Sequence, residues 1–322
     1  MKRGSFLNNV VSWLARVRLT LRPAVTASVL LSAVVFLGCS EGDPSIAPTS
    51  SPESQPSDVP TTFVRATSSP SPTPAPDPAA SCVAAPPELG DPGQQRREDV
   101  PGAVVYTSLQ VTDQDRQRVL DGLAAARDFI FREFGPIERT ICLEIRTDDL
   151  PPGAAVTVQN RVIVWTESGG WTRPYPWLLS RATAHEYVHV WSAAIAMDVA
   201  ASNSTAYGPG WLVEGVAEFL SMRITLDANL APLDETDNFT HTLLRLSRAR
   251  PEDLVDLPLP NAEDYATAEL AVSRLMADLP LTALELYFAA LGNGDPWPLA
   301  FVHAFGKSPS TFYAEFAATP TP

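Results

Sequence analysis

The sequence is short of basic residues once its first segment is set aside. Five of its 23 lysines and arginines lie within residues 1–39, which leaves 18 basic residues against 37 acidic ones and a formal charge of −19 for the rest of the chain. A protein with that balance repels polyanions. Nucleic acid and anionic lipid headgroups are therefore disfavoured as partners.

The first segment lacks an apolar run as long as a membrane-spanning helix needs. The uncharged run from Ala24 to Gly38 follows five basic residues and ends at Cys39. Because a span takes about 20 apolar residues, we interpret the segment as a secretory signal cleaved just before Cys39. The sequence Phe36-Leu37-Gly38-Cys39 resembles a bacterial lipobox, which implies a lipidated Cys39; an uncleaved signal anchor is the alternative. The first interpretation predicts a protein on the bacterial cell surface, anchored to the outer face of the membrane.

Cysteines are few, and residues 40–100 contain few large apolar side chains. With Cys39 taken by lipid, only Cys82 and Cys142 remain. An exported compartment allows them to pair if their Cα atoms come within about 5.5 Å, and two unrelated thiols are the alternative.

Residues 40–100 are rich in Pro, Ser, Thr and Ala, as in Ser69–Pro76. Such a segment cannot offset its ordering entropy by burial, so we predict a disordered stalk there and one folded domain at 101–322.

The folded part has no internal repeat, and its apolar pattern predicts an α+β fold. Strands are expected at 104–106 and 140–146 and as a hairpin at 155–166, with a helix at 112–134. The return arm of the hairpin, 161–166, is expected to be an exposed sheet edge that could pair with an extended peptide. Two long helices are expected next, at 177–197 and 211–227. Further helices are predicted at 240–248, 261–279, 281–291, 298–305 and 309–317.

The predicted helix at 177–197 carries His185-Glu186-Tyr187-Val188-His189, an H-E-x-x-H pattern. Residues four apart lie on one helix face, so both imidazoles can bind one metal ion, and zinc suits such ligands. The next helix begins with Trp211-Leu212-Val213-Glu214-Gly215-Val216-Ala217-Glu218. One of its carboxylates can complete a site of two histidines and one glutamate. Three protein ligands and one open position are typical of catalytic zinc.

These two motifs resemble the gluzincins, the clan of thermolysin-like and aminopeptidase-like zinc metallopeptidases, and especially its peptidase-MA-like lipoproteins. The resemblance covers about residues 100–318 and implies that His185, His189 and Glu214 hold zinc, with Glu186 as general base. Glu218 is then expected behind the ligands, where it can accept the free ring N–H of a ligating histidine. Which of the two glutamates binds zinc stays open at this point.

The chain departs from the family in two ways. Twenty-four residues separate His189 from Glu214, somewhat more than in compact members, and no G-x-M-E-N segment is present to capture a free amine. An aminopeptidase activity is therefore disfavoured. For the oxyanion donor that a zinc hydrolase needs, Tyr265 resembles a tyrosine that the family places on a later helix, and His241 competes with it.

The sequence thus predicts zinc-dependent hydrolysis of a peptide or protein substrate by a membrane-tethered extracytoplasmic enzyme. Its expected fold is a small mixed sheet, an active-site helix and an all-helical C-terminal lobe. The alternatives are a catalytically silent zinc-binding surface lipoprotein with an extracellular or cell-wall partner, and a zinc hydrolase that acts on another carbonyl.

Overall fold

The computed structural model describes residues 82, 93–147, 155–166, 175–196, 207–246, 254–255, 257 and 262–319. All of them belong to one compact unit, Asp77–Pro322. The predicted signal with Cys39 and the predicted stalk as far as residue 81 lie outside the described residues. Within the described ranges, no helix combines the length and the apolar character that crossing a membrane requires.

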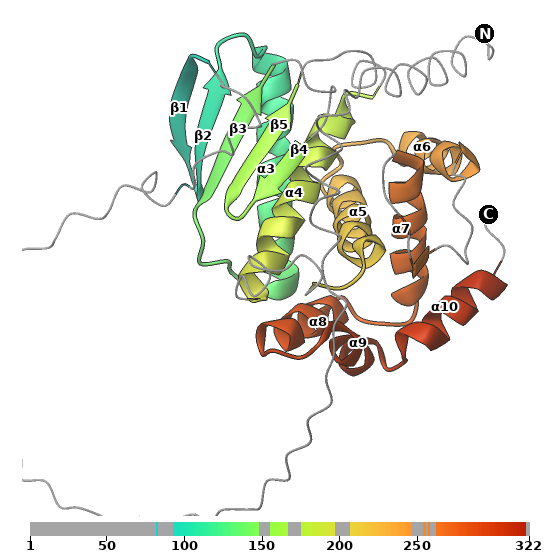
Figure 1. Cartoon of the computed structure of the whole chain (residues 1–322). Coiled ribbons are helices and arrows are strands. Elements are labelled where there is room, and N and C mark those ends of the chain that lie inside the picture. The colour runs from blue at the N-terminus through green and yellow to red at the C-terminus, as the bar shows by residue number, and fades with distance from the viewer. Residues whose placement is uncertain are drawn as a thin grey trace, which may run out of the picture. The chain divides into compact units, whose positions relative to one another are not determined.

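A five-stranded mixed sheet forms one side of this unit (Figure 1). Its strands are β1 (Gln95–Val100), β2 (Ala103–Ser108), β3 (Ile141–Arg146), β4 (Ala155–Val158) and β5 (Arg161–Trp165). They lie in the order β1-β2-β3-β5-β4. The inner pairs β2–β3 and β3–β5 are parallel, whereas β1 and β4 are antiparallel to their neighbours. The small mixed sheet that the sequence predicts is therefore present.

Strand β1 lies inside the segment predicted to be a disordered stalk, so the predicted boundary after residue 100 is wrong for residues 95–100. Its sequence, QRREDV, has no apolar alternation that would predict a strand; backbone pairing with β2 holds it in the sheet. Cys82, further back in the same segment, forms a disulfide with Cys142 of β3, with Cα atoms 5.6 Å apart. The folded unit therefore begins well before residue 101.

The predicted hairpin at 155–166 is confirmed, but its outer arm is β4 and not β5. Strand β5 pairs with β3 on one side and with β4 on the other. The prediction that residues 161–166 form an exposed edge is therefore wrong. Sequence periodicity gives the face of a strand but not its neighbours, and here the antiparallel return places β4 at the edge.

Eight helices occur in the described ranges: α3 (Asp113–Phe134), α4 (Trp177–Ile195), α5 (Gly210–Asp227), α6 (Leu233–Leu246), α7 (Ala262–Leu275), α8 (Thr282–Gly292), α9 (Trp297–Phe305) and α10 (Pro309–Ala318). Thr112 caps α3, and its side chain accepts a hydrogen bond from the backbone N–H of Asp115. Helices α3 and α4 pack against the sheet, and the later helices lie beyond α4 (Figure 1).

The core begins on one face of the sheet and continues through the helices. Ile141, Leu143 and Ile145 alternate along β3 and belong to the same buried cluster as Trp191 of α4 and Trp211 of α5. Helix α4 therefore lies between the sheet and the later helices and is buried along most of its length. A polar side chain in the middle of α4 must find its partners inside the protein.

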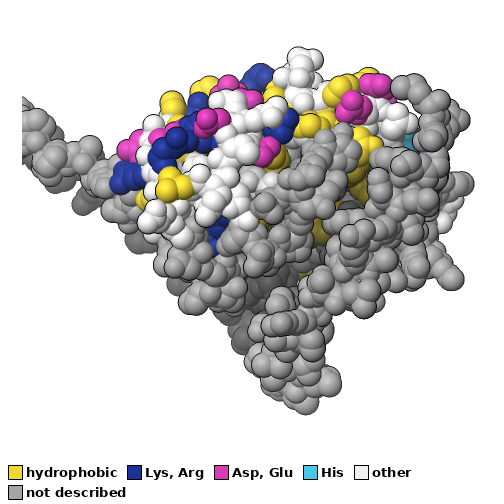
Figure 2. Space-filling model, turned by 90° about the horizontal axis from the view of Figure 1, so that it is seen from above, with side chains coloured by type: hydrophobic (Ala, Val, Ile, Leu, Met, Phe, Trp, Pro, Cys, Tyr) yellow, Lys and Arg dark blue, Asp and Glu magenta, His cyan; other side chains and the backbone are white. Residues whose placement is uncertain are grey.

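Charged side chains on the described surface are mixed in sign. Figure 2 shows basic and acidic side chains interspersed on the face that it displays. Exposed ion pairs in the described part of the chain include Arg97–Asp99 and Lys307–Glu315, at 3.1 and 2.7 Å. Pairs of this kind contribute at most about 1 kcal/mol each, so the fold depends on the core.

Candidate metal site

Helix α4 brings the two histidines of the H-E-x-x-H pattern together. His185 and His189 are one turn apart, their ring centroids are 4.8 Å apart, and their Nε2 atoms are 3.0 Å apart. Two imidazole nitrogens this close can share one proton or bind one cation. The two rings therefore point at one position, as the spacing of four predicts.

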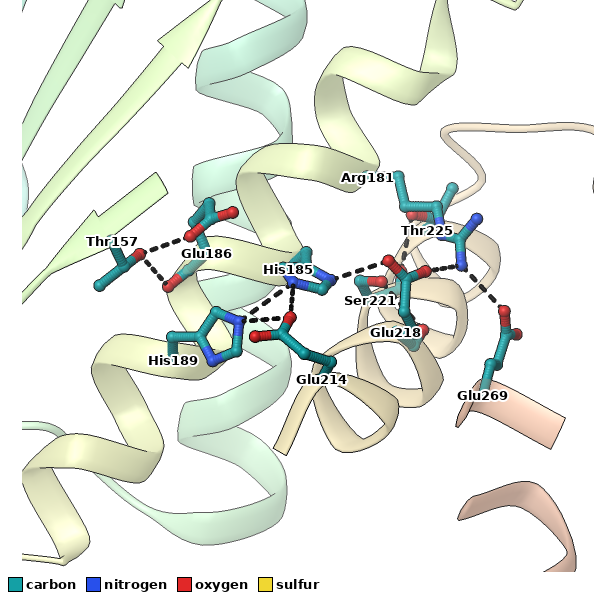
Figure 3. A network of polar contacts seen from close by, with 10 residues as sticks. All are labelled: Thr157, Arg181, His185, Glu186, His189, Glu214, Glu218, Ser221, Thr225 and Glu269. Carbon is teal, nitrogen blue, oxygen red and sulfur yellow. Dashed lines mark hydrogen bonds and ion pairs between the residues drawn. The ribbon is translucent and has the colours of Figure 1, made fainter. Parts of the chain in front are cut away.

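Helix α5 adds a carboxylate to this pair. Oε2 of Glu214 lies 3.1 Å from Nε2 of His185 and 3.3 Å from Nε2 of His189 (Figure 3). These three atoms form a nearly equilateral triangle, and the three residues form a possible metal-binding group. Two ligands bound to tetrahedral zinc at about 2.0–2.1 Å are about 3.3–3.4 Å apart. The donor set and its spacing therefore fit zinc.

Glu218 contacts the opposite nitrogen of the same imidazole. Its Oε1 lies 3.1 Å from Nδ1 of His185, an ion-pair distance at an angle that is poor for a hydrogen bond. The structure thus separates the two glutamates that the sequence leaves open: Glu214 shares the Nε2 side of His185 with His189, and Glu218 lies behind the ring. Their roles as ligand and as supporting acceptor remain predictions.

The surroundings of this cluster shift its proton equilibria strongly. Burial lowers the pKa of His185, but Glu218 and Glu214 outweigh it and raise the pKa well above 6.5. Burial raises the pKa of Glu214, but the two histidines outweigh it and hold the pKa well below its ordinary value. In the metal-free protein the cluster therefore holds protons that a metal ion must displace, so metal affinity is expected to rise with pH.

Glu186 follows His185 in the sequence and turns toward the edge strand of the sheet (Figure 3). Oγ1 of Thr157, in β4, lies 2.7 Å from Oε2 of Glu186 and 3.0 Å from its backbone oxygen. Thr157 shares the helix-facing side of the hairpin with Val162, its register partner. No sequence pattern predicts this contact, because it depends on which strand lies at the edge.

Of the two candidates for an oxyanion donor, Tyr265 lies at the cluster. Its ring centroid, on α7, is 6.2 Å from that of His185. Burial and then the charges of Glu214, Glu218 and Glu186 raise the pKa of Tyr265 well above 10, so the phenol keeps its proton. His241 is exposed on α6. The remaining histidine, His303, is exposed on α9 and lies 3.2 Å from Asp295.

Gly215 explains how α7 comes so close to α5. A Cβ atom on Gly215 would lie 2.5 Å from the backbone oxygen of Ala268 and 2.8 Å from Val272. Contacts under 3.0 Å require atoms to move, so only glycine permits this packing. The glycine after Glu214 in the second motif therefore sets the distance from α5 to the helix that carries Tyr265.

Comparison with known proteins gives distant structural likenesses for this chain. No family model and no curated protein matches it. Among solved structures, it is similar to an M1 zinc metallopeptidase from Deinococcus radiodurans, with 13% identity, a TM-score of 0.43, and coverage of 68% of this chain and 49% of that one. A mutant two-domain M1 zinc metallopeptidase bound to L-arginine matches with 14% identity, a TM-score of 0.43, and coverage of 71% and 52%. The chain thus spans about half the length of these structures.

Proposed function

We propose that this chain is a zinc-dependent hydrolase that cleaves peptide bonds in a peptide or protein substrate. The observation that carries the proposal is the triangle of Nε2 of His185, Nε2 of His189 and Oε2 of Glu214, with sides of 3.0, 3.1 and 3.3 Å. This donor set resembles the two-histidine, one-glutamate sets of catalytic zinc sites, which keep one position open. Zinc bound there would supply Lewis-acid activation of a water molecule and of the substrate carbonyl.

Glu186 is the residue proposed to move the proton. Its Oε2 is engaged by Oγ1 of Thr157, and among the described residues Oε1 has no such partner. Oε1 is therefore the atom that would accept a proton from the attacking water and deliver it to the leaving amine. The hydroxyl of Thr157 keeps the carboxylate in one orientation during this exchange.

Tyr265 is proposed to stabilise the charge that develops on the substrate oxygen. A phenol that stays protonated is a hydrogen-bond donor, and a donor fixed before the reaction stabilises an oxyanion without further reorganisation. Among the described strands, β4 lies at the edge of the sheet beside α4, where an extended peptide could pair with it. A peptide paired with β4 would lie next to Glu186.

The cleavage experiment uses the purified full chain loaded with one equivalent of zinc and a diverse peptide library, with products identified by mass spectrometry. We expect cleavage by the wild type. Glu186→Gln should lower the rate about 10²- to 10⁴-fold while zinc still binds, because only the proton acceptor changes. Zinc binding without cleavage by the wild type would contradict the proposal and favour a silent zinc-binding lipoprotein or another substrate class.

We further propose that the enzyme is held at the outer face of a bacterial membrane by lipid on Cys39. The support is the sequence pattern that ends at Cys39. In cells given a radioactive fatty acid, the wild type should be labelled and Cys39→Ser should not be. Cys82→Ser is the matched control, because Cys82 forms a disulfide with Cys142. This variant should still be labelled. Equal labelling of wild type and Cys39→Ser would contradict the lipid anchor.

A further inference from the structure

A second layer of charged side chains lies behind the metal-binding cluster. It consists of Arg181, Glu218 and Glu269, which we call the site network (Figure 3). Nη2 of Arg181 forms an ion pair with Oε2 of Glu218 and lies 3.0 Å from Oε2 of Glu269. Arg181 is only 6% exposed and Glu269 only 8%. One guanidinium therefore joins two carboxylates inside the protein.

The site network and the metal site are built from the same three helices at the same spacing. Three helices each supply one residue to the site and, four positions away, one to the network: His185 and Arg181 on α4, Glu214 and Glu218 on α5, Tyr265 and Glu269 on α7. Side chains four apart on a helix lie on one face, one turn above the other. The network is therefore a layer stacked on the site, with the same three helices as its supports.

Glu218 connects the network to the metal-binding cluster. Its Oε1 lies 3.1 Å from Nδ1 of His185, and its Oε2 pairs with Arg181. The negative charge of a carboxylate beside Nδ1 favours the ring proton on that nitrogen, which leaves the lone pair of Nε2 for a metal ion, and it favours this orientation of the ring. The strength of this effect on His185 depends on how far Arg181 neutralises the carboxylate of Glu218.

Glu269 determines how the charge of Arg181 is divided. With Glu269 in place, the guanidinium serves two carboxylates from two different helices. Without Glu269, the guanidinium of Arg181 would interact with Glu218 alone. The stronger pairing would weaken the attraction between Glu218 and His185. The same ion pair fastens α7 to α4, four residues from Tyr265. Buried ion pairs rarely improve stability over apolar side chains of similar size, so stability alone does not account for the network.

We propose that Arg181 and Glu269 are positioning residues of the zinc site, which orient His185 through Glu218 and hold Tyr265 on α7 against the site. This inference rests on the proposed function, since it assumes that the cluster binds zinc. The side chains of Arg181 and Glu269 pair with each other, and Arg181 also pairs with Glu218, behind the triangle of possible ligand atoms. Their effect reaches the chemistry through His185 and Tyr265.

The test compares the full-length wild type with Glu269→Gln and Arg181→Lys at pH 8. Zinc affinity is measured by competition with a chelator, and ligand geometry by the visible absorption of the cobalt-loaded protein. Glu269→Gln keeps the shape of the side chain and removes its charge. Arg181→Lys keeps the charge but replaces the planar guanidinium, whose Nη2 contacts both carboxylates, by an ammonium group of different shape. We expect the zinc Kd to rise about tenfold in each variant, with a shifted cobalt spectrum.

Glu144→Gln is the matched control, because Glu144 is another buried glutamate bonded to arginine and lies in the sheet. Its zinc Kd should stay within about twofold of the wild type. Urea unfolding of the zinc-free proteins identifies a purely structural role, which would lower the free energy of unfolding and leave the cobalt spectrum of folded protein unchanged. Failure of the wild type to bind zinc would overturn the proposed function as well. Wild-type binding and cleavage, with unchanged Kd and spectra in both variants, would overturn this inference alone.

Discussion

Two buried groups of ion pairs in this protein use the same chemistry in different places. The site network of Arg181, Glu218 and Glu269 lies on three helices behind His185. The sheet network consists of Glu144, Arg146 and Arg161, with Glu144 bonded to both arginines. Glu144 and Arg146 alternate with Leu143 and Ile145 along β3, so the sheet network lies on the face of the sheet turned away from α4.

The two networks are both buried, but they contact different groups. Both networks remove charges from water and recover the cost through guanidinium–carboxylate contacts. Only the site network ends at a side chain that can bind a metal. Arg146 of the sheet network instead lies over the ring of Trp165, 5.9 Å from its centroid. We expect the two networks to contribute similarly to stability and differently to chemistry.

Breaking each network at its central residue gives the largest expected effect on stability. Arg181→Met leaves Glu218 and Glu269 facing each other, and Glu144→Gln leaves two buried arginines without their shared carboxylate. Removal of one partner from a buried ion pair costs about 3–5 kcal/mol. Urea unfolding of the zinc-free proteins should show losses of this size for both. Zinc affinity should fall only for Arg181→Met, and an equal fall for Glu144→Gln would remove the distinction between the networks.

The closeness of His185 and His189, two members of the possible metal-binding group, could be predicted from the sequence because it depends on local geometry. Spacing of four on one continuous helix brings His185 and His189 together whatever the rest of the fold does. The same spacing puts Glu214 and Glu218 on one face of α5, but the choice between them required knowing how α5 packs against α4. Family resemblance, and not periodicity, pointed to Tyr265.

The supporting residues could not be predicted for the opposite reason. Arg181 and Glu269 are charged residues in helices, and such residues are mostly exposed, so only the packing of α7 on α4 and α5 identifies them as buried partners. Thr157 contacts Glu186 because β4 is the edge strand, which strand periodicity does not specify. Strand β1 is not predictable from the sequence, because it lacks apolar alternation and depends on pairing with β2.

The disulfide gives a second way to perturb the sheet side without touching the helices. Cys142 shares the sheet face of Glu144, and its bond to Cys82 closes a loop with a sequence separation of 60 residues. Cross-linking a loop of this length stabilises a protein by about 4 kcal/mol in the chain-entropy model. Cys82→Ser should lower the free energy of unfolding by about that amount. Zinc affinity should not change, and a fall in affinity would show that the sheet side also supports the site.

The site network should be distinguishable from the sheet network by the pH dependence of its stability. Burial raises the pKa of Glu269 to about 7, although Arg181 lowers it in part. Because the folded state then holds this proton between about pH 4.5 and 7 and the unfolded state does not, wild-type stability should fall as pH rises through that window. Relative to Glu269→Gln, the fall should be roughly 3 kcal/mol, with no further change above pH 7.

Urea unfolding of the zinc-free wild type and Glu269→Gln, across a pH series from 4 to 9, measures this difference directly. Glu144→Gln serves again as the control, and its difference from the wild type should not show this fall between pH 4.5 and 7. A difference between wild type and Glu269→Gln that is constant with pH would mean that Glu269 is ionised throughout. Its buried contact with Arg181 would then be a fully charged ion pair like those of the sheet.

Tyr265→Phe tests whether α7 contributes to the chemistry as well as to the packing. The change removes one hydroxyl and keeps the ring, which lies near that of His185. Loss of a single oxyanion donor lowers kcat by about 100-fold or more, so we expect a fall of that size in peptide cleavage with zinc affinity within about twofold of the wild type. His241→Gln, on the exposed surface of α6, should cleave at the wild-type rate. Unchanged cleavage by Tyr265→Phe together with a large fall for His241→Gln would reverse the assignment of the donor. Glu269→Gln would then be expected to weaken zinc binding through His185 but to leave the cleavage rate of the zinc-saturated enzyme close to that of the wild type.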